Sequence, residues 1–120
     1  MDKLTINTAK TLFVSFTAKD LESSLKLKNA LNYLADLSRN EEGIIRYEVF
    51  RSDNNPLDYY VLETWSTERT LENHLNQFHV MDFATQCMLL LAKPFTIVPL
   101  AIPFKSEWLK PLITNSISLN

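Results

Sequence analysis

His74 and His79 are the only histidines in the 120 residues, and they lie five positions apart. Shortly before them comes the run Glu63-Thr64-Trp65, which adds a carboxylate and an indole. An imidazole accepts or donates a proton near pH 7, so two of them around one pocket would suit general acid–base catalysis. This stretch is therefore the first candidate for chemistry in the chain.

The spacing of the two histidines sets a condition on the local structure. On one continuous helix, five residues turn through about 500°, so the imidazoles would point about 140° apart. They converge only if the helix breaks within "LNQF", where Asn76 is a mediocre helix former that favours helix ends. We therefore expect His74 to close one helix and His79 to open the next. The structural alternative is that His74 is a hydrogen-bonded core histidine and His79 a solvent-facing cap.

Glu63 is predicted to lie on a strand, where alternation places it on the same face as Val61 and Trp65. A carboxylate beside these two apolar side chains must be paired, hydrated or protonated. One interpretation is a structural ion pair with Arg46 or Arg51 on the neighbouring strand, or an arginine across a dimer interface. The other is a carboxylate with a tuned pKa in a cavity.

Metal and thiol chemistry have weaker support. The histidine spacing is not HxxxH, and no third ligand is obvious, although Glu63 would be able to serve. Cys87 is the single cysteine, which excludes an intrachain disulfide and a thiolate cluster and fits a reducing compartment. It lies in an apolar run that disfavours a thiolate, so we do not expect it to be a nucleophile.

Composition excludes several classes of protein. Hydrophobic residues make up 46% and charged residues 22%, enough for one folded domain. The net charge of −2 and the lack of a basic run disfavour nucleic-acid binding, and a single glycine, Gly43, excludes Gly-rich phosphate loops. The apolar "MLLLAKPFTIVPLAIPF" is broken by Lys93 and three prolines and is shorter than the roughly 20 residues of a spanning helix. No targeting segment is visible, so we expect a cytoplasmic protein without membrane contact.

The element order predicts the fold. Strands are expected at about 10–18, 44–51, 59–65 and 95–102, and helices from Asp20 to about Arg39, from a cap at Ser66 or Thr67, and at about 80–92. Pro99 and Pro103 place the last strand at an edge or outside the sheet. The β-α-β-β-α-β order is the ferredoxin-like pattern, an α+β fold with an antiparallel sheet.

Strand alternation also assigns faces. In the strand at 44–51, it groups Ile45, Tyr47 and Val49 on one side. Tyr47 is therefore expected to line the core or a cavity, where its phenol would hold a substrate oxygen. The sheet face away from the helices also carries apolar residues, and a homodimer would cover it.

We expect three segments in the chain. Residues 1–9 would form an N-terminal extension and residues 10–100 the ferredoxin-like domain. Residues 101–120 would form a C-terminal arm, in which Trp108 and Leu109 would wrap the neighbouring subunit.

The segments "EEGIIRYEVFR", "YYVLETW" and "LENHLNQFHVMDF" together resemble the antibiotic biosynthesis monooxygenase family, and most closely its quinol monooxygenase type. The resemblance covers about residues 10–100. It rests on a Glu-x-Gly turn leading to Tyr47, a strand ending Glu63-x-Trp65, a helix ending His74-Leu75 and a second histidine, His79. It implies a dimeric α+β barrel.

The resemblance also implies an activity. Some members oxidise anthrones or hydroquinones with O₂ and no metal or flavin, so the expected substrate is a small aromatic molecule and no cofactor is expected. His74 would be the base or proton shuttle, and Glu63 would orient or tune it. Trp65 and Tyr47 would stack on or hydrogen-bond to the substrate ring, with His79 at the mouth of the pocket.

Other activities of the family remain alternatives. Haem-degrading members use an Asn, a Trp and a His, but the first strand lacks the Asn and His74 occupies the Trp position, which disfavours haem oxygenation. An isomerase of a small phosphorylated keto-sugar would use the same acid–base pair, with Arg46, Arg51 or Lys93 holding the phosphate. A non-enzymatic dimer that binds a small ligand is a further alternative.

Overall fold

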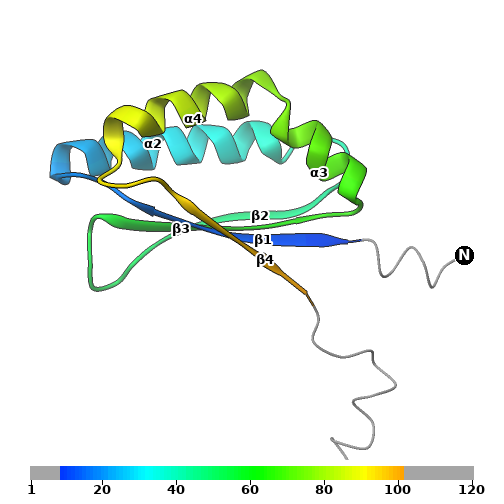
Figure 1. Ribbon diagram of the computed structural model, residues 1–120, viewed down its shortest axis with the longest axis horizontal. Helices are drawn as coiled ribbons and strands as arrows, with labels where there is room; N and C mark the ends of the chain where they lie inside the picture. The colour runs from blue at the N-terminus through cyan, green and yellow to red at the C-terminus, as the bar shows by residue number, and fades with distance from the viewer. Residues whose placement is uncertain (1–8, 102–120) are drawn as a thin grey trace, which may run out of the picture.

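The computed structural model describes residues 9–101, which form a four-stranded antiparallel sheet with three helices. The elements in chain order are β1 (Lys10–Thr17), α2 (Leu21–Ser38), β2 (Ile44–Arg51), β3 (Asp58–Trp65), α3 (Glu68–Leu75), α4 (Phe78–Leu90) and β4 (Thr96–Leu100). The strand order is β2-β3-β1-β4, and the helices lie on one face of the sheet (Figure 1). The predicted ferredoxin-like α+β fold is confirmed.

Helix α2 begins just after Asp20, as the sequence predicted. The Asp20 side chain accepts a 2.7 Å hydrogen bond from the Ser23 backbone N–H and so caps the first turn. Leu27, Leu31 and Leu34 are buried against the sheet. Their spacing of three to four residues gives the helix one apolar stripe, which anchors it across the sheet.

Helix α4 differs slightly from its predicted bounds. It starts at Phe78 rather than near Val80 and ends at Leu90 rather than Ala92. Phe83, Cys87 and Leu90 are buried, whereas Val80, Ala84 and Leu91 are half-buried. Burial raises the pKa of the Cys87 thiol to about 12, which supports its interpretation as an inert core residue.

The two outer strands show different irregularities. Strand β4 is an edge strand that pairs only with β1 in the described sheet, and this position tolerates Pro99, which has no N–H to donate. In β2, a bulge between Ile44 and Arg46 shifts the register. The prediction that Ile45 shares the face of Tyr47 is therefore wrong, because the extra residue turns Ile45 outward, where it is 60% exposed.

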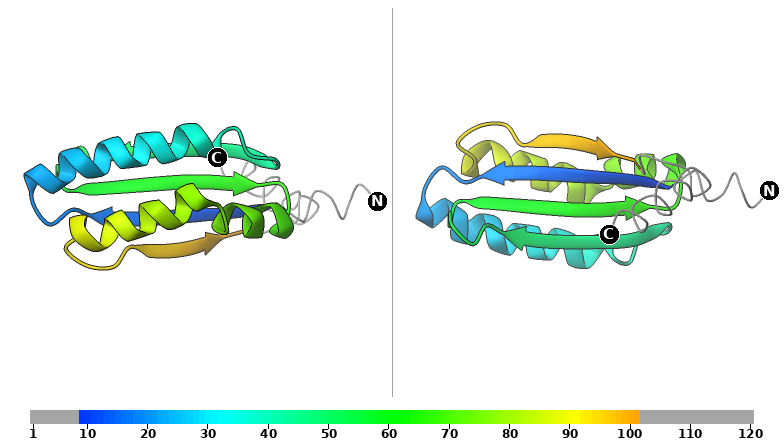
Figure 2. Two further views of the ribbon diagram at one scale, coloured as in Figure 1. Left: turned by 90° about the horizontal axis from the view of Figure 1, so that it is seen from above. Right: turned by 90° about the horizontal axis from the view of Figure 1, so that it is seen from below.

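Among residues 9–101, no element covers the face of the sheet away from the helices, which we call the uncovered sheet face (Figure 2, right). On it the rings of Phe13 and Tyr60 stack at a centroid distance of 5.5 Å. Strand register places Phe50, Leu62 and Val98 on the same face. None of the described helices is both long and apolar enough to cross a bilayer. Trp108, Leu109 and Pro103, part of the expected arm and last strand, lie outside the described residues.

Candidate acid–base site

The break between the two histidines is present. Helix α3 ends at Leu75 and α4 begins at Phe78, and the Gln77 backbone N–H donates to the His74 carbonyl at 3.0 Å across the turn. His74 therefore closes one helix and His79 opens the next, as predicted. Their ring centroids lie 6.2 Å apart.

A carboxylate that the sequence did not single out joins the two imidazoles. Glu41 Oε2 lies 2.9 Å from His74 Nδ1 and 2.6 Å from His79 Nε2. A carboxylate can only accept hydrogen bonds, so each of these ring nitrogens carries a proton and donates an N–H hydrogen bond to Glu41. The only signal in the sequence was its place in the Glu-x-Gly turn, and Glu41 is more than 30 residues away from either histidine.

Gly43 holds the turn that carries Glu41 against helix α3. Its φ of +85° is the left-handed conformation that favours glycine, and an added Cβ would lie 2.4 Å from Thr70 Cγ2. Thr70 forms the capping box of α3 with Thr67, and Ser66 donates its backbone N–H to the Gly43 carbonyl at 2.7 Å. The turn and the start of α3 are thus packed as one unit.

Glu63 faces the other side of the His74 ring. Its Oε1 accepts a 2.7 Å hydrogen bond from Trp65 Nε1 and lies 3.7 Å from His74 Nε2. The interpretation of Glu63 as the ion-pair partner of Arg46 is wrong, because Arg46 pairs with Glu48 on the exposed side of β2. In residues 9–101 no ion pair joins Glu63 to Arg51 either.

The environment shifts the proton affinity of two groups. Burial raises the pKa of Glu63, with a further contribution from the charge of Glu41, while the Trp65 hydrogen bond and His74 oppose the rise. Burial also raises the pKa of Tyr47 far above that of a free phenol. Tyr47 is therefore a neutral phenol, and Glu63 is a carboxyl group that holds its proton more tightly than usual.

Two aromatic rings enclose His74. The Trp65 ring lies 4.4 Å from the imidazole, centroid to centroid, at 31°, and the Tyr47 ring lies 5.8 Å away at 63°. Tyr47 also faces Glu63 across the β2–β3 ladder. The structure thus brings all five sequence-predicted site residues into one cluster. Four of them are buried, and the His79 side chain is 18% exposed.

Two surface hollows border this cluster. One, of about 340 Å³, is lined by Glu41, Glu42, Asn73, Asn76 and Gln77. The other, of about 540 Å³, is lined by Arg39, Ile44, Ile45, Arg46, Tyr47 and Glu48. His74, Glu63 and Trp65 line neither of these two hollows, which meet the cluster only at Glu41 and Tyr47.

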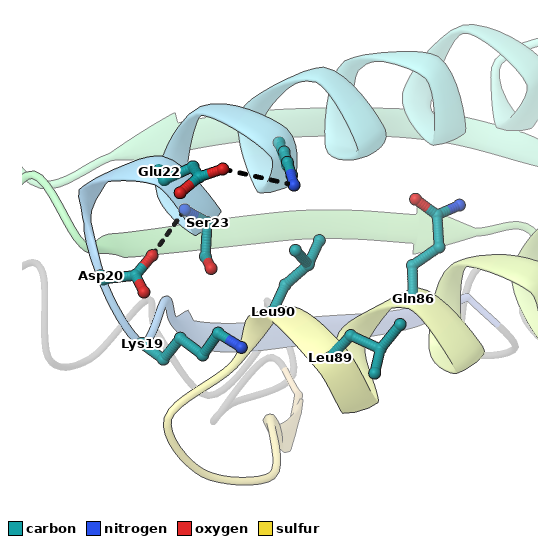
Figure 3. A pocket seen from close by; sticks show the side chains of 8 residues that line it. Lys19, Asp20, Glu22, Ser23, Gln86, Leu89 and Leu90 are labelled. Atoms are coloured by element: carbon teal, nitrogen blue, oxygen red, sulfur yellow. Dashed lines mark hydrogen bonds and ion pairs between the residues drawn. The ribbon is translucent and has the colours of Figure 1, made fainter.

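A third hollow, of about 530 Å³, lies beside the start of α2 and the end of α4 (Figure 3), at the end of the helical layer away from α3 (Figure 1). It is lined by the start of α2 and the end of α4, including Asp20, Glu22 and Gln86. The Asp20 carboxylate is occupied by its capping hydrogen bond, and Glu22 pairs with Lys26. None of the predicted site residues lines it, so it is not the candidate site.

The family model described as antibiotic biosynthesis monooxygenase matches residues 22–86, which is 65 of the 120 residues. This range contains every residue of the cluster. A comparison with curated protein sequences gave no match.

Solved structures share the fold. PA3566 from Pseudomonas aeruginosa is 27% identical and superposes with a TM-score of 0.74, covering 81% of this chain and 96% of its own. Rv0793 from Mycobacterium tuberculosis is 18% identical with a TM-score of 0.75, over 82% and 99%. SnoaB, a cofactor-independent oxygenase from Streptomyces nogalater, is 14% identical with a TM-score of 0.70, over 82% and 97%.

Proposed function

The chain belongs to the antibiotic biosynthesis monooxygenase family, and from this premise we propose that it is a cofactor-independent monooxygenase acting on a small quinol or polycyclic phenol. One observation carries the proposal: His74 is held between two carboxyl groups, Glu41 and Glu63, in a buried aromatic setting. The fold shared with SnoaB, a cofactor-independent oxygenase, supports the choice of reaction.

The proposed reaction needs no outside reductant. A hydroquinone loses four electrons to O₂; one oxygen atom enters the ring carbon and the other leaves as water, so the products are a hydroxyquinone and water. An anthrone balances in the same way, since its CH₂ becomes a carbonyl. Removing the acidic proton first makes the ring electron-rich enough to reduce O₂, and an apolar site protects the reactive intermediates from water.

His74 is the proposed base. Its Nδ1–H group donates a hydrogen bond to Glu41, so the lone pair on Nε2 is available to accept a proton. Glu63 lies 3.7 Å from that nitrogen and has a raised pKa, so it is placed to share the abstracted proton. Glu41 then links His74 to the partly exposed His79, which gives a route for the proton toward solvent.

Tyr47 and Trp65 are proposed to hold the substrate ring. Tyr47 lines the 540 Å³ hollow and its ring lies beside His74, so the substrate would enter from that side. Trp65 is fully buried, with 0% exposure, and would contact the ring only after the Tyr47 side chain moves. The polar hollow at Glu41 is left for proton exit, with His79 at its border.

A homodimer is part of the proposal. The uncovered sheet face carries the stacked Phe13–Tyr60 pair and the exposed Phe50, and a second copy of the same sheet would bury them. A cytoplasmic location is proposed from the single, buried thiol.

The keto-sugar isomerase has less support. It would use the same imidazole and carboxyl groups, but its phosphate needs a free cation near them. The two arginines that line the hollow beside Tyr47 are engaged by other carboxylates, Arg46 by Glu48 and Arg39 by Asp36.

The test is O₂ uptake by purified, metal-free protein with a panel of hydroquinones and anthrones. Uptake above the autoxidation background that disappears in His74→Ala is the expected result. A Gln86→Ala variant, altered in the distant hollow, is the matched control and should match wild type. The oxygenase proposal is wrong if no substrate gives uptake, and His74 is not the base if His74→Ala takes up O₂ as fast as wild type.

A further inference from the structure

We propose that Glu41, His74 and His79 bind a divalent first-row transition-metal ion, with Zn²⁺ as the ion that tests the site. One ligand atom from each residue lies within 4.8 Å of the other two. Two imidazole nitrogens and one carboxylate oxygen form a donor set that suits Zn²⁺ and Fe²⁺ and leaves coordination positions open. The three residues come from the turn after α2, the end of α3 and the start of α4.

The three ligand atoms reach tetrahedral spacing by side-chain movements of about 1 Å. Tetrahedral ligands at about 2.0–2.1 Å from Zn²⁺ lie about 3.3 Å from one another. Glu41 Oε2 is 2.9 Å from His74 Nδ1 and 2.6 Å from His79 Nε2, so these two pairs must open by less than about 1 Å. The two imidazole nitrogens lie within 4.8 Å of each other, so that pair must close by at most about 1.5 Å. The His79 side chain lies in the first turn of α4 and is 18% exposed, which leaves it room for this movement.

Charge and access favour a cation. Glu41 and Glu42 line the 340 Å³ hollow together with the amide side chains of Asn73, Asn76 and Gln77, a polar path from solvent to the ligands. In the described part of the chain, no Lys or Arg forms an ion pair with Glu41, Glu42 or Glu63. Among the described residues, Glu41 therefore pairs with the two imidazoles, and a divalent ion would take the place of the protons that lie between them.

Glu63 is placed to accept a hydrogen bond from the second ring nitrogen of a metal-bound His74. An ion on Nδ1 places the remaining ring proton on Nε2, which faces Glu63 Oε1 at 3.7 Å. Ligating histidines commonly donate this second N–H to a carboxylate, which fixes the ring. Glu41 thus takes the third-ligand position for which the sequence had offered Glu63, and Glu63 orients His74 instead.

Metal binding and proton abstraction require different tautomers of His74. The proposed base needs a free lone pair on Nε2, whereas the metal-bound ring carries a proton there. It follows, resting on the proposed function, that Zn²⁺ inhibits the oxygenase by holding His74 in the wrong tautomer.

The test is calorimetric titration of the untagged, chelator-treated full chain with Zn²⁺, and absorption spectroscopy with Co²⁺. The expected result is one ion per chain and Co²⁺ d–d bands. His79→Ala and Glu41→Gln should each weaken binding by at least tenfold. Glu42→Gln, which alters the same hollow without removing a ligand, should stay within about threefold of wild type. Circular dichroism checks that each variant is folded, and His79→Ala, the change at the more exposed side chain, decides if Glu41→Gln does not fold.

Binding that is absent, or equally strong in His79→Ala, would overturn the metal site. The result does not depend on turnover. Zn²⁺ binding without any O₂ uptake would support the metal site and reject the oxygenase. O₂ uptake without Zn²⁺ binding would support the oxygenase and reject the metal site. If both occur, O₂ uptake should fall as Zn²⁺ fills the site, and the loss should be smaller in His79→Ala; uptake that is unchanged at full occupancy rejects the inhibition.

Discussion

Glu41 and His74 are 33 residues apart in the sequence, yet Oε2 of one and Nδ1 of the other are 2.9 Å apart. The contact joins the turn after α2 to the last turn of α3 and decides which ring nitrogen of His74 carries a proton. The opposite nitrogen then faces Glu63, 3.7 Å away. Glu41 therefore sets the direction in which His74 can accept a proton.

His74→Ala should lower turnover by about 10²–10⁴-fold, the usual contribution of a positioned general base. The side chain is buried, so the variant should also have a lower melting temperature. Steady-state O₂ uptake and thermal melts measure the two effects separately. Unchanged turnover in a folded variant means that His74 is not the base; should the alanine variant not fold, His74→Gln provides the same comparison.

Glu63→Gln should change how stability depends on pH. The folded state raises the pKa of Glu63 above 4.5, so between 4.5 and the raised value the folded protein binds more protons than the unfolded chain. Wild-type stability therefore falls as pH rises through this window, by about 1.4 kcal/mol for each pH unit that the window spans. Glutamine does not titrate and removes that fall.

Urea unfolding at several pH values from 4 upward measures this difference. Glu48→Gln, which changes an exposed carboxylate on β2, is the control and should keep the wild-type profile. Parallel profiles for wild type and Glu63→Gln would show that Glu63 ionises normally in the folded protein.

Gly43→Ala should destabilise the fold by about 1–3 kcal/mol, because φ of +85° strains an L-residue and the new Cβ would meet Thr70. It should also move Glu41 away from the histidines and reduce turnover in the fraction that remains folded. Glu42→Ala, at the adjacent exposed position, should leave both properties near wild type. Chemical denaturation and O₂ uptake give the two readouts, and a Gly43→Ala protein as stable as wild type contradicts the packing argument.

The structural features that could be predicted from the sequence are those that follow from a local pattern of residues. Spacing alone required the helix break between His74 and His79, and alternation alone put Glu63 beside Trp65. The bulge that turned Ile45 outward leaves the composition of β2 unchanged, so alternation assigned the wrong residue. Glu41 lies in an irregular turn, and its role depends on Gly43 docking that turn against Thr70, a contact between distant segments that no periodicity reports.

Phe50→Glu should convert a dimer into a monomer. Phe50 is 49% exposed on the uncovered sheet face, and a carboxylate buried against the same face of a second copy would be repelled and desolvated. Multi-angle light scattering should give the mass of two chains for wild type and of one for the variant. Leu25→Glu, at a 61% exposed position on α2 in the helical layer, should remain dimeric. A wild-type mass of one chain, or a dimer that survives Phe50→Glu, would mean that two copies do not cover the open sheet face.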